Sequence, residues 1–271
     1  MNLRIVECEG APRDLGLDQG VACGDALRAW IAARPVSSEG PADRTLRRDV
    51  RRHFPQLAER IEGLARGARV PEVELGRGLA GPLGAPPVEA ASRAPLALGI
   101  DAAYAAGAPV LAFAASAFDT DWLVRRSRPE NGLASLELAT PWSVGALAGV
   151  NEAGLAVACV PLASPQPGDA CHAPAFLLVQ DCLQRFQGVD GATDWCRHRP
   201  AGGRAHILLA DASGRLGGIE VAAGHRTPLT LEEGFVAAAH AGPDPVVVVV
   251  LDTRERCLRI ARPGQPVAIL R

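Results

Sequence analysis

The sequence changes character once along its length, and this change limits the folds open to it. Up to about residue 70 the apolar residues show the spacing of amphipathic helices, whereas from residue 96 on most apolar residues stand in short runs separated by Gly, Pro, Asp or Asn. Residues 76–95 between these parts are rich in Gly, Pro and Ala, which is typical of a loop or linker. Helices followed by strands, without an alternating βαβ rhythm, predict an α+β fold. We expect an N-terminal strand and helical region (1–80), a linker (81–95) and a sandwich of two β-sheets with covering helices (96–271).

Local patterns place the individual elements. The N-terminal region is predicted to hold a strand at 3–8, a helix at 14–33 and a second helix at 42–69 that bends at Pro55. The run of five valines at 246–250 is expected to be buried on both faces of its sheet. Two later helices are predicted at 175–187 and 191–198, and strands are predicted at 96–100, 110–115, 133–138, 144–150, 155–160, 206–210, 217–221, 235–239, 246–251 and 257–261.

Composition excludes several classes of function. The net charge of the 271 residues is −2 and the isoelectric point is about 6.3, so there is no electrostatic basis for binding nucleic acid or an anionic membrane. No apolar stretch is long enough for a membrane-spanning helix or a signal peptide, and we expect a cytoplasmic protein. All 28 basic residues are arginine, which excludes a lysine nucleophile or Schiff base.

The seven cysteines do not form a recognisable metal site. They are scattered, and none belongs to a Cys-x-x-Cys pair. We expect most of them to be reduced residues of the core. No metal and no cofactor is predicted.

A polar corner near the middle of the chain is the first candidate for chemistry. Residues 144–150 and 155–160 are apolar, and Asn151-Glu152-Ala153-Gly154 interrupts them, as in a strand, a tight turn and a second strand. Asn and Gly are common turn residues, so an ordinary hairpin turn is one interpretation. Asn151 is also one of only three asparagines, and an Asn amide at the end of a strand can donate an N–H to a developing oxyanion.

Six segments follow one another over nearly the whole chain and carry recognisable motifs. They are the Gly-x-Pro turn and G-x-x-x-G helix start at 9–20, the Phe-Pro helix start at 54–67, the Asp-Trp strand end at 118–122, the G-x-N-E-x-G-L segment at 149–157, the hairpin at 208–215 followed by Glu220, and the strand at 236–240 that is similar to a T-N-H motif. In this order they resemble one family, the acyl-coenzyme A:6-aminopenicillanate acyltransferase family of cysteine-type N-terminal-nucleophile (Ntn) hydrolases, and the segment 149–157 is the most similar of the six.

The resemblance implies an αββα sandwich, a pro-segment-like role for residues 1–80, and chemistry on amide bonds. In that family the precursor cleaves itself before a cysteine, whose new α-amine then serves as the base for its own thiol. The Asp and Asn of the motifs position and stabilise the tetrahedral intermediate. Carried over to this chain, these roles fall on Asp121 and Asn151.

The sequence departs from the family at the nucleophile. No cysteine occurs between Cys23 and Cys159, and between residues 46 and 115 the only side-chain hydroxyl besides Tyr104 is that of Ser92. The position of the Asn in T-N-H is Ala239, which leaves only His240. The catalytic candidates are therefore Ser92, Asp121, Asn151 and His240.

Three hypotheses follow. The first is a divergent family member without the cysteine nucleophile and without self-cleavage, which acts as a binding or regulatory pseudoenzyme. The second is an active amide (C–N) hydrolase or acyltransferase on a small amide or acyl-CoA substrate, with Ser92 as nucleophile and Asp121 and Asn151 in support. The third is that Cys8 or Cys23 has taken the place of the nucleophile. A small-molecule amide or acyl compound is the expected partner, and the oligomeric state stays open.

Overall fold

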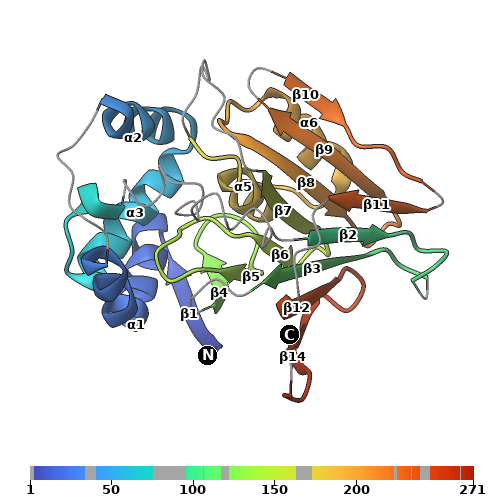
Figure 1. Ribbon diagram of the computed structural model, residues 1–271, viewed down its shortest axis with the longest axis horizontal. Helices are drawn as coiled ribbons and strands as arrows, with labels where there is room; N and C mark the ends of the chain where they lie inside the picture. Colours follow the sequence, from blue (N-terminus) through green and yellow to red (C-terminus); the bar gives the residue numbers. More distant parts are fainter. Residues whose placement is uncertain are drawn as a thin grey trace.

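Two stacked β-sheets form the centre of the protein in a computed structural model (Figure 1). The structure describes residues 3–33, 41–75, 96–105, 107–116, 122–162, 173–222, 225–232, 234–238, 245–262 and 264–271. Within these residues no helix is long and apolar enough to cross a membrane.

The larger sheet has eight strands in the order β1-β4-β5-β6-β7-β8-β9-β10. Strand β1 pairs parallel with β4, and the other neighbours pair antiparallel. The strands are β1 (Arg4–Gly10), β4 (Leu123–Pro129), β5 (Ser135–Ala139), β6 (Ala148–Asn151), β7 (Ala156–Leu162), β8 (Arg204–Ala210), β9 (Leu216–Ala222) and β10 (His225–Pro228).

The smaller sheet has six antiparallel strands in the order β11-β2-β3-β12-β13-β14. Leu111, Phe113, Val247 and Val249 on one of its faces are completely buried against the eight-stranded sheet. The strands are β2 (Leu96–Ile100), β3 (Val110–Ser116), β11 (Phe235–Ala238), β12 (Pro245–Asp252), β13 (Cys257–Ala261) and β14 (Ala268–Leu270).

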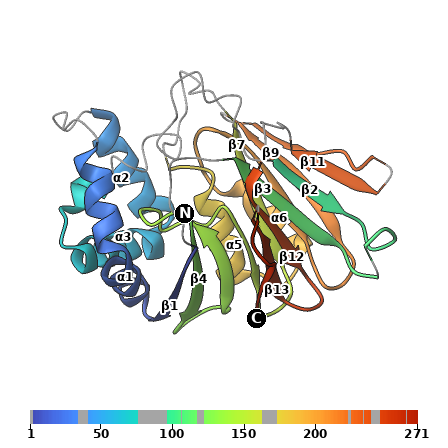
Figure 2. The same ribbon diagram turned by 60° about the horizontal axis from the view of Figure 1, so that its bottom comes forward.

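The helices pack against the eight-stranded sheet. Helix α5 (Leu177–Arg185) lies on β6 and β7, α6 (Val189–His198) lies on β8 and β9, and α1 (Pro12–Ala32) contacts β1 and β4. Helices α2 (Pro41–His53) and α3 (Pro55–Ala68) join α1 in a group at one side of the sandwich (Figures 1 and 2). The predicted α+β class, with two sheets and covering helices, is confirmed.

Glycines let α1 and α3 pack with their backbones in contact. A Cβ on Gly16 would fall inside the contact distance of the Arg60 carbonyl oxygen, and a Cβ on Gly63 would do the same at the Arg13 carbonyl oxygen. Gly20 and Gly67 repeat this relationship one turn further along. The Gly-x-x-x-G spacing in the sequence therefore serves the packing of this helix pair.

Several sequence expectations need correction. The helix predicted at 42–69 is two helices that break at Phe54, where Pro55 begins the second one. Strands β4, β10 and β14 were not predicted. The N-terminal region also contributes β1 to the eight-stranded sheet, so it shares a sheet with residues that follow position 96. The valine run was expected to be buried on both faces of its sheet. This expectation is wrong, because the side chains of Val248 and Val250 are only half-buried.

Candidate functional site

Three of the four predicted catalytic residues, Ser92, Asp121 and His240, lie outside the described residues. Their described neighbours along the chain show where they attach to the fold. Ser92 lies four positions before the start of β2, Asp121 lies two positions before the start of β4, and His240 lies two positions after the end of β11.

The strand ends beside Ser92 and His240 meet at one end of the sandwich. In the six-stranded sheet Leu96 of β2 pairs with Ala114 near the end of β3, and Ala97 pairs with Ala238 at the end of β11. Ser116, the last residue of β3, pairs with Pro245, the first residue of β12. The chain therefore enters or leaves the described strands here several times, and we call this the entry end of the sandwich.

Asn151 lies at the opposite end. It pairs with Ser135, which pairs with Ser127. Leu123, two positions after Asp121, pairs instead with Ala139 at the far end of β5. The four steps from Leu123 to Ser127 span about 13 Å at the rise of a β-strand.

The contact of the Asn151 turn with the six-stranded sheet agrees with this placement. The backbone of Gly154, in the same turn, approaches the carbonyl oxygen of Thr253 so closely that a Cβ would lie 2.6 Å from it. Thr253 begins the turn after β12. Asp252, the last residue of β12, pairs with Val110 of β3, and Val110 pairs with Ile100 at the C-terminal end of β2. The turn is therefore separated from Leu96 by the length of β2.

The side chain of Asn151 is fully engaged within the protein. Its Nδ2 donates to the carbonyl oxygens of Leu183 at 2.9 Å and Phe186 at 2.8 Å, which lie at the C-terminal end of α5. Its Oδ1 accepts from the backbone N–H of Ala153 at 3.1 Å and of Leu155 at 3.0 Å. An amide NH₂ has only two donors, so in this geometry no N–H is available to an oxyanion. The structure gives Asn151 the role of joining the β6–β7 turn to α5.

The described cysteines are buried thiols. Cys8, Cys23, Cys159, Cys182, Cys196 and Cys257 are all buried, and none of these six is in a disulfide. Burial raises the pKa of the Cys8 thiol to about 11, and it also raises the pKa values of Cys159 and Cys257. The hydrogen bond with Cys196, at 3.6 Å between the sulfurs, raises the pKa of Cys182. Since the thiolate is the nucleophilic form, none of the thiols with a raised pKa is poised to react at neutral pH.

One histidine that sequence reasoning missed lies near the entry end. His206 is the third residue of β8, between Val160 on β7 and Glu220 on β9. Burial lowers the pKa of His206, with Glu220 acting in the opposite direction, and its Nδ1 is buried without a hydrogen-bond partner. Burial therefore favours the neutral form of the ring. Nothing in the sequence around it distinguishes it from a core histidine.

The loop after β5 adds two polar atoms at the same end. Gln19 of α1 holds this loop by donating Nε2 to the carbonyl oxygens of Pro141 and Ser143, each at 3.0 Å. Thr140 Oγ1 and Trp142 Nε1 are buried and have no hydrogen-bond partner. Buried polar atoms are seldom left unpaired. These two atoms at the entry end can therefore each still form a hydrogen bond.

A charged network centred on Arg125 and Glu137 lies beneath the helices. Arg125 donates to Glu137 at 2.8 Å, to Gln19 at 2.9 Å, to the Ser143 carbonyl oxygen at 2.7 Å and to Gln180 at 2.9 Å. Glu137 also accepts from Ser135 and Gln180, each at 2.6 Å. Burial alone would raise the pKa of Glu137, but Arg125 and Arg60 hold it below its usual range. We assign this network to the core, since its members are buried.

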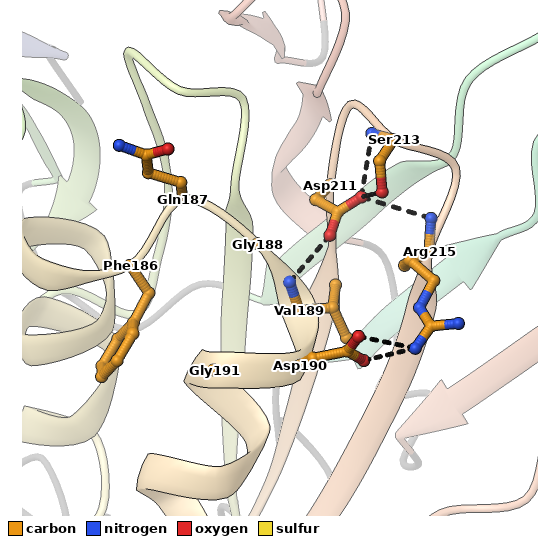
Figure 3. Close-up of a pocket in the computed structure, with 9 residues that line it drawn as sticks. All are labelled: Phe186, Gln187, Gly188, Val189, Asp190, Gly191, Asp211, Ser213 and Arg215. Carbon is orange, nitrogen blue, oxygen red and sulfur yellow. Dashed lines mark hydrogen bonds and ion pairs between the residues drawn. The ribbon is translucent and has the colours of Figure 1, made fainter.

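Two surface hollows lie at the end of the sandwich that holds Asn151. One, of about 450 Å³, is formed by the α5–α6 connection and the β8–β9 turn (Figure 3). Its polar groups bind one another: Asp211 accepts from Val189 N at 2.7 Å and from Ser213 Oγ at 2.6 Å, and Arg215 forms an ion pair with Asp190 at 2.6 Å. The other, of about 570 Å³, shares Gln187, Gly188, Asp211 and Ser213 with the first. In the described residues no cluster of His, Cys, Asp or Glu could hold a metal ion.

Comparisons with known proteins give a weak structural likeness. No protein-family model matches the chain, and no curated protein matches it in sequence. The solved structure of penicillin V acylase from Agrobacterium tumefaciens is similar over 65% of this chain and 85% of its own, with 12% identity and a TM-score of 0.45.

Two further solved structures show a similar degree of likeness. A mutant of conjugated bile acid hydrolase from Clostridium perfringens matches over 64% of this chain and 92% of its own, with 9% identity and a TM-score of 0.45. The N-acylethanolamine-hydrolyzing acid amidase ortholog from Caenorhabditis elegans matches over 65% and 100%, with 13% identity and a TM-score of 0.43. At these identities and TM-scores the likeness establishes neither a family nor a reaction.

Proposed function

We propose that this protein is a divergent member of the Ntn-hydrolase class that binds a small amide or acyl compound without the cysteine reaction of that class. The observation that carries the proposal is the state of the thiols: all six described cysteines are buried inside the fold. The cysteine reaction needs an accessible thiol whose own α-amine has been freed by cleavage. Cys8, Cys159 and Cys257 instead lie within strands, and Cys23, Cys182 and Cys196 lie within helices.

The same observation opposes the hypothesis that Cys8 or Cys23 serves as a displaced nucleophile. Cys8 is 1% exposed and Cys23 is 0% exposed. Burial raises the pKa of Cys8, and the attraction of Arg60 and Arg125 for a thiolate does not overcome the cost of that burial. Neither sulfur is accessible to a substrate.

The arrangement of the sheets supports the class. Two sheets are stacked face to face, the strand ends beside Ser92 and His240 meet at the entry end, and β4, which follows Asp121, begins at the same end of its own sheet. Three buried polar atoms at this end have no hydrogen-bond partner, namely His206 Nδ1, Thr140 Oγ1 and Trp142 Nε1, and they could pair only with a ligand group that inserts between the side chains covering them. These groups suit the carbonyl and N–H of an amide, because such a ligand both accepts and donates hydrogen bonds.

A second candidate function is amide hydrolysis with Ser92 as nucleophile. The meeting of the strand ends next to Ser92 and His240 favours it, because a serine that frees its own α-amine needs supporting groups nearby. This reaction would have to proceed without Asn151, whose amide is engaged at the opposite end.

Intact mass spectrometry of the purified protein separates the two candidates. We expect one uncleaved chain of 28.2 kDa. Two fragments with a new N-terminus at residue 92 would contradict the proposal and support the serine mechanism. A thermal-shift screen of small amides and N-acyl compounds then tests binding. Stabilisation of the wild type and of Ser92→Ala alike, without release of an amine or acid, is the expected result.

A further inference from the structure

Two buried thiols from different helices are in contact. Cys182 lies in α5 and Cys196 lies in α6, and their sulfur atoms are 3.6 Å apart. Both side chains are completely buried. The two residues are 14 positions apart in the chain, so their contact depends on the short α5–α6 connection, which brings the second helix back against the first.

The two sulfurs need only a small movement to become bonded. A disulfide holds its sulfurs at about 2.0 Å, so about 1.6 Å of the 3.6 Å separation has to be closed. The thiols share a hydrogen bond, and no other side chain stands between them. Rotation about the side-chain bonds of the two cysteines can therefore bring the sulfurs together while both helices stay in place.

Little is lost when these thiols give up their protons. The other polar neighbour of Cys182 Sγ is the carbonyl oxygen of Ala192, at the long distance of 3.9 Å. A thiol is a weak hydrogen-bond donor, so neither contact stabilises the reduced pair strongly. A bond between the sulfurs would also restrict the unfolded chain, which favours the folded state.

We propose that Cys182 and Cys196 are a redox-sensitive pair that forms a disulfide between α5 and α6 when the protein meets hydrogen peroxide. One thiol, as its thiolate, attacks a peroxide oxygen, which breaks the O–O bond and gives a sulfenic acid and one water. The second thiol attacks the sulfenic sulfur, forms the S–S bond and releases a second water. The two sulfurs together lose two electrons, the peroxide gains them, and both thiol protons end in water.

Burial makes this pair slow to react in both directions. The hydrogen bond with Cys196, together with burial, raises the pKa of Cys182, so only a small fraction of the thiol is ionised at any moment. The same burial protects the disulfide, because a reducing thiolate has to reach one of its sulfurs. The pair therefore responds to sustained oxidation and not to a brief exposure.

The bond would stiffen the connection that forms one of the surface hollows. Phe186, Gln187 and Gly188 lie between α5 and α6 and line the hollow in Figure 3. Asn151 already binds the carbonyl oxygen of Phe186 from the β6–β7 turn. With Cys182 and Cys196 bonded, both ends of the connection are fixed, and its hydrogen exchange should slow.

Peroxide treatment of the fully reduced chain at pH 8, where more of each thiol is ionised, tests the proposal. We expect the wild type to lose about 2 Da, for the two hydrogens that leave the thiols. Its thermal midpoint should rise by roughly 5 °C, because the bond closes a loop of the unfolded chain. After the remaining thiols are blocked, cleavage before aspartate should give fragment 181–189, which contains Cys182, joined to fragment 194–210, which contains Cys196.

Single alanine variants provide the controls. Cys182→Ala and Cys196→Ala should each abolish the mass loss. Cys257→Ala removes another completely buried thiol and should leave the mass loss unchanged. Mapping the bond in the wild type needs no variant, so the test does not depend on how the variants fold.

Two results would overturn the proposal. The first is a peroxide-treated protein that keeps all seven thiols or gains only oxygen. The second is a disulfide that joins Cys196 to a different cysteine, such as Cys159, which is buried in the same core.

Discussion

Arg125 and Glu137, cross-strand partners on β4 and β5, form an ion pair at 2.8 Å with both side chains completely buried. The pair lies where α1, α3 and α5 meet the eight-stranded sheet, since Gln19, Arg60 and Gln180 all reach it. Two arginines share one carboxylate here. Burial lowers the pKa of Arg60 to about 10, and Arg125 acts in the same direction. Glu137 is therefore the counter-charge that stabilises both buried guanidinium groups.

Glu137→Gln should therefore destabilise the protein strongly. It leaves Arg125 and Arg60 buried without a counter-charge, which typically costs about 3–5 kcal/mol of unfolding free energy. Urea denaturation at pH 7 measures this change. Glu7→Gln is the control, because Glu7 is an exposed partner of Arg126 and its loss should cost less than about 1 kcal/mol. Equal effects of the two changes would contradict the role given to Glu137.

The same carboxylate predicts a dependence of stability on pH. The pKa of Glu137 is lowered in the folded state, so its contribution is complete above the ordinary Glu pKa of about 4.3 and is lost as the pH falls through the folded value. We expect the wild type to lose unfolding free energy below about pH 4 more steeply than Glu137→Gln. Parallel curves for the two proteins would show that other groups dominate acid unfolding.

Gly63→Ala should separate α1 from α3. The new Cβ would collide with the carbonyl oxygen of Arg13, and backbone atoms of a packed helix cannot give way cheaply. We expect a loss of about 3 kcal/mol or more, at the upper end of overpacking effects. Gly24→Ala is the contrasting change: its nearest neighbour, at 3.0 Å, is the end of the flexible Arg28 side chain, so helix propensity should make it neutral or stabilising. Thermal melts of both variants provide the comparison.

Asn151→Ala should act on stability rather than on any reaction at the entry end. It removes four hydrogen bonds and leaves two buried carbonyl oxygens without donors, a loss of about 2–4 kcal/mol. Hydrogen exchange should rise in the β6–β7 turn and at the end of α5 together. Asn131→Ala, at an exposed position, serves as the control. An Asn151→Ala protein as stable as the wild type would refute the structural role.

The thiols predict a simple chemical result. Of the seven cysteines, six are buried in the described residues, and Cys171 lies outside them. We expect at most one thiol of the native protein to react rapidly with Ellman's reagent at pH 8, and all seven to react in guanidinium chloride. Two or more fast thiols in the native protein would show that the buried set is accessible.

The sequence predicted the strands that have simple apolar patterns and missed β4, which does not. Strand β4 contains three arginines, and its burial makes sense only with the partners that Arg125 finds on α1 and α5. Such partners come from distant parts of the chain, so local patterning cannot reveal them. The turn at Asn151 was predicted from its own residues because turn chemistry is local.

The candidate site was less predictable, since its geometry depends on strand register. Asn151 and Asp121 fall in adjacent motifs of one resemblance, yet β4, β5 and β6 place Asn151 at the end of the sheet opposite to the one where Leu123 follows Asp121. His206 and Thr140 carry no local signal at all. Their buried, unpaired atoms became visible only when neighbouring strands were in place.

The parallel pairing of β1 with β4 has a consequence for the order of folding. Arg4 meets Leu123, so β1 leaves the ribosome long before the strand that it pairs with. Closing so long a loop is costly in entropy and slow. Helices α1 and α3 can associate early through their glycines, but β1 must wait, as an unpaired strand, until β4 has been synthesised. During that interval both edges of β1 are unpaired, and unpaired strand edges are prone to aggregation.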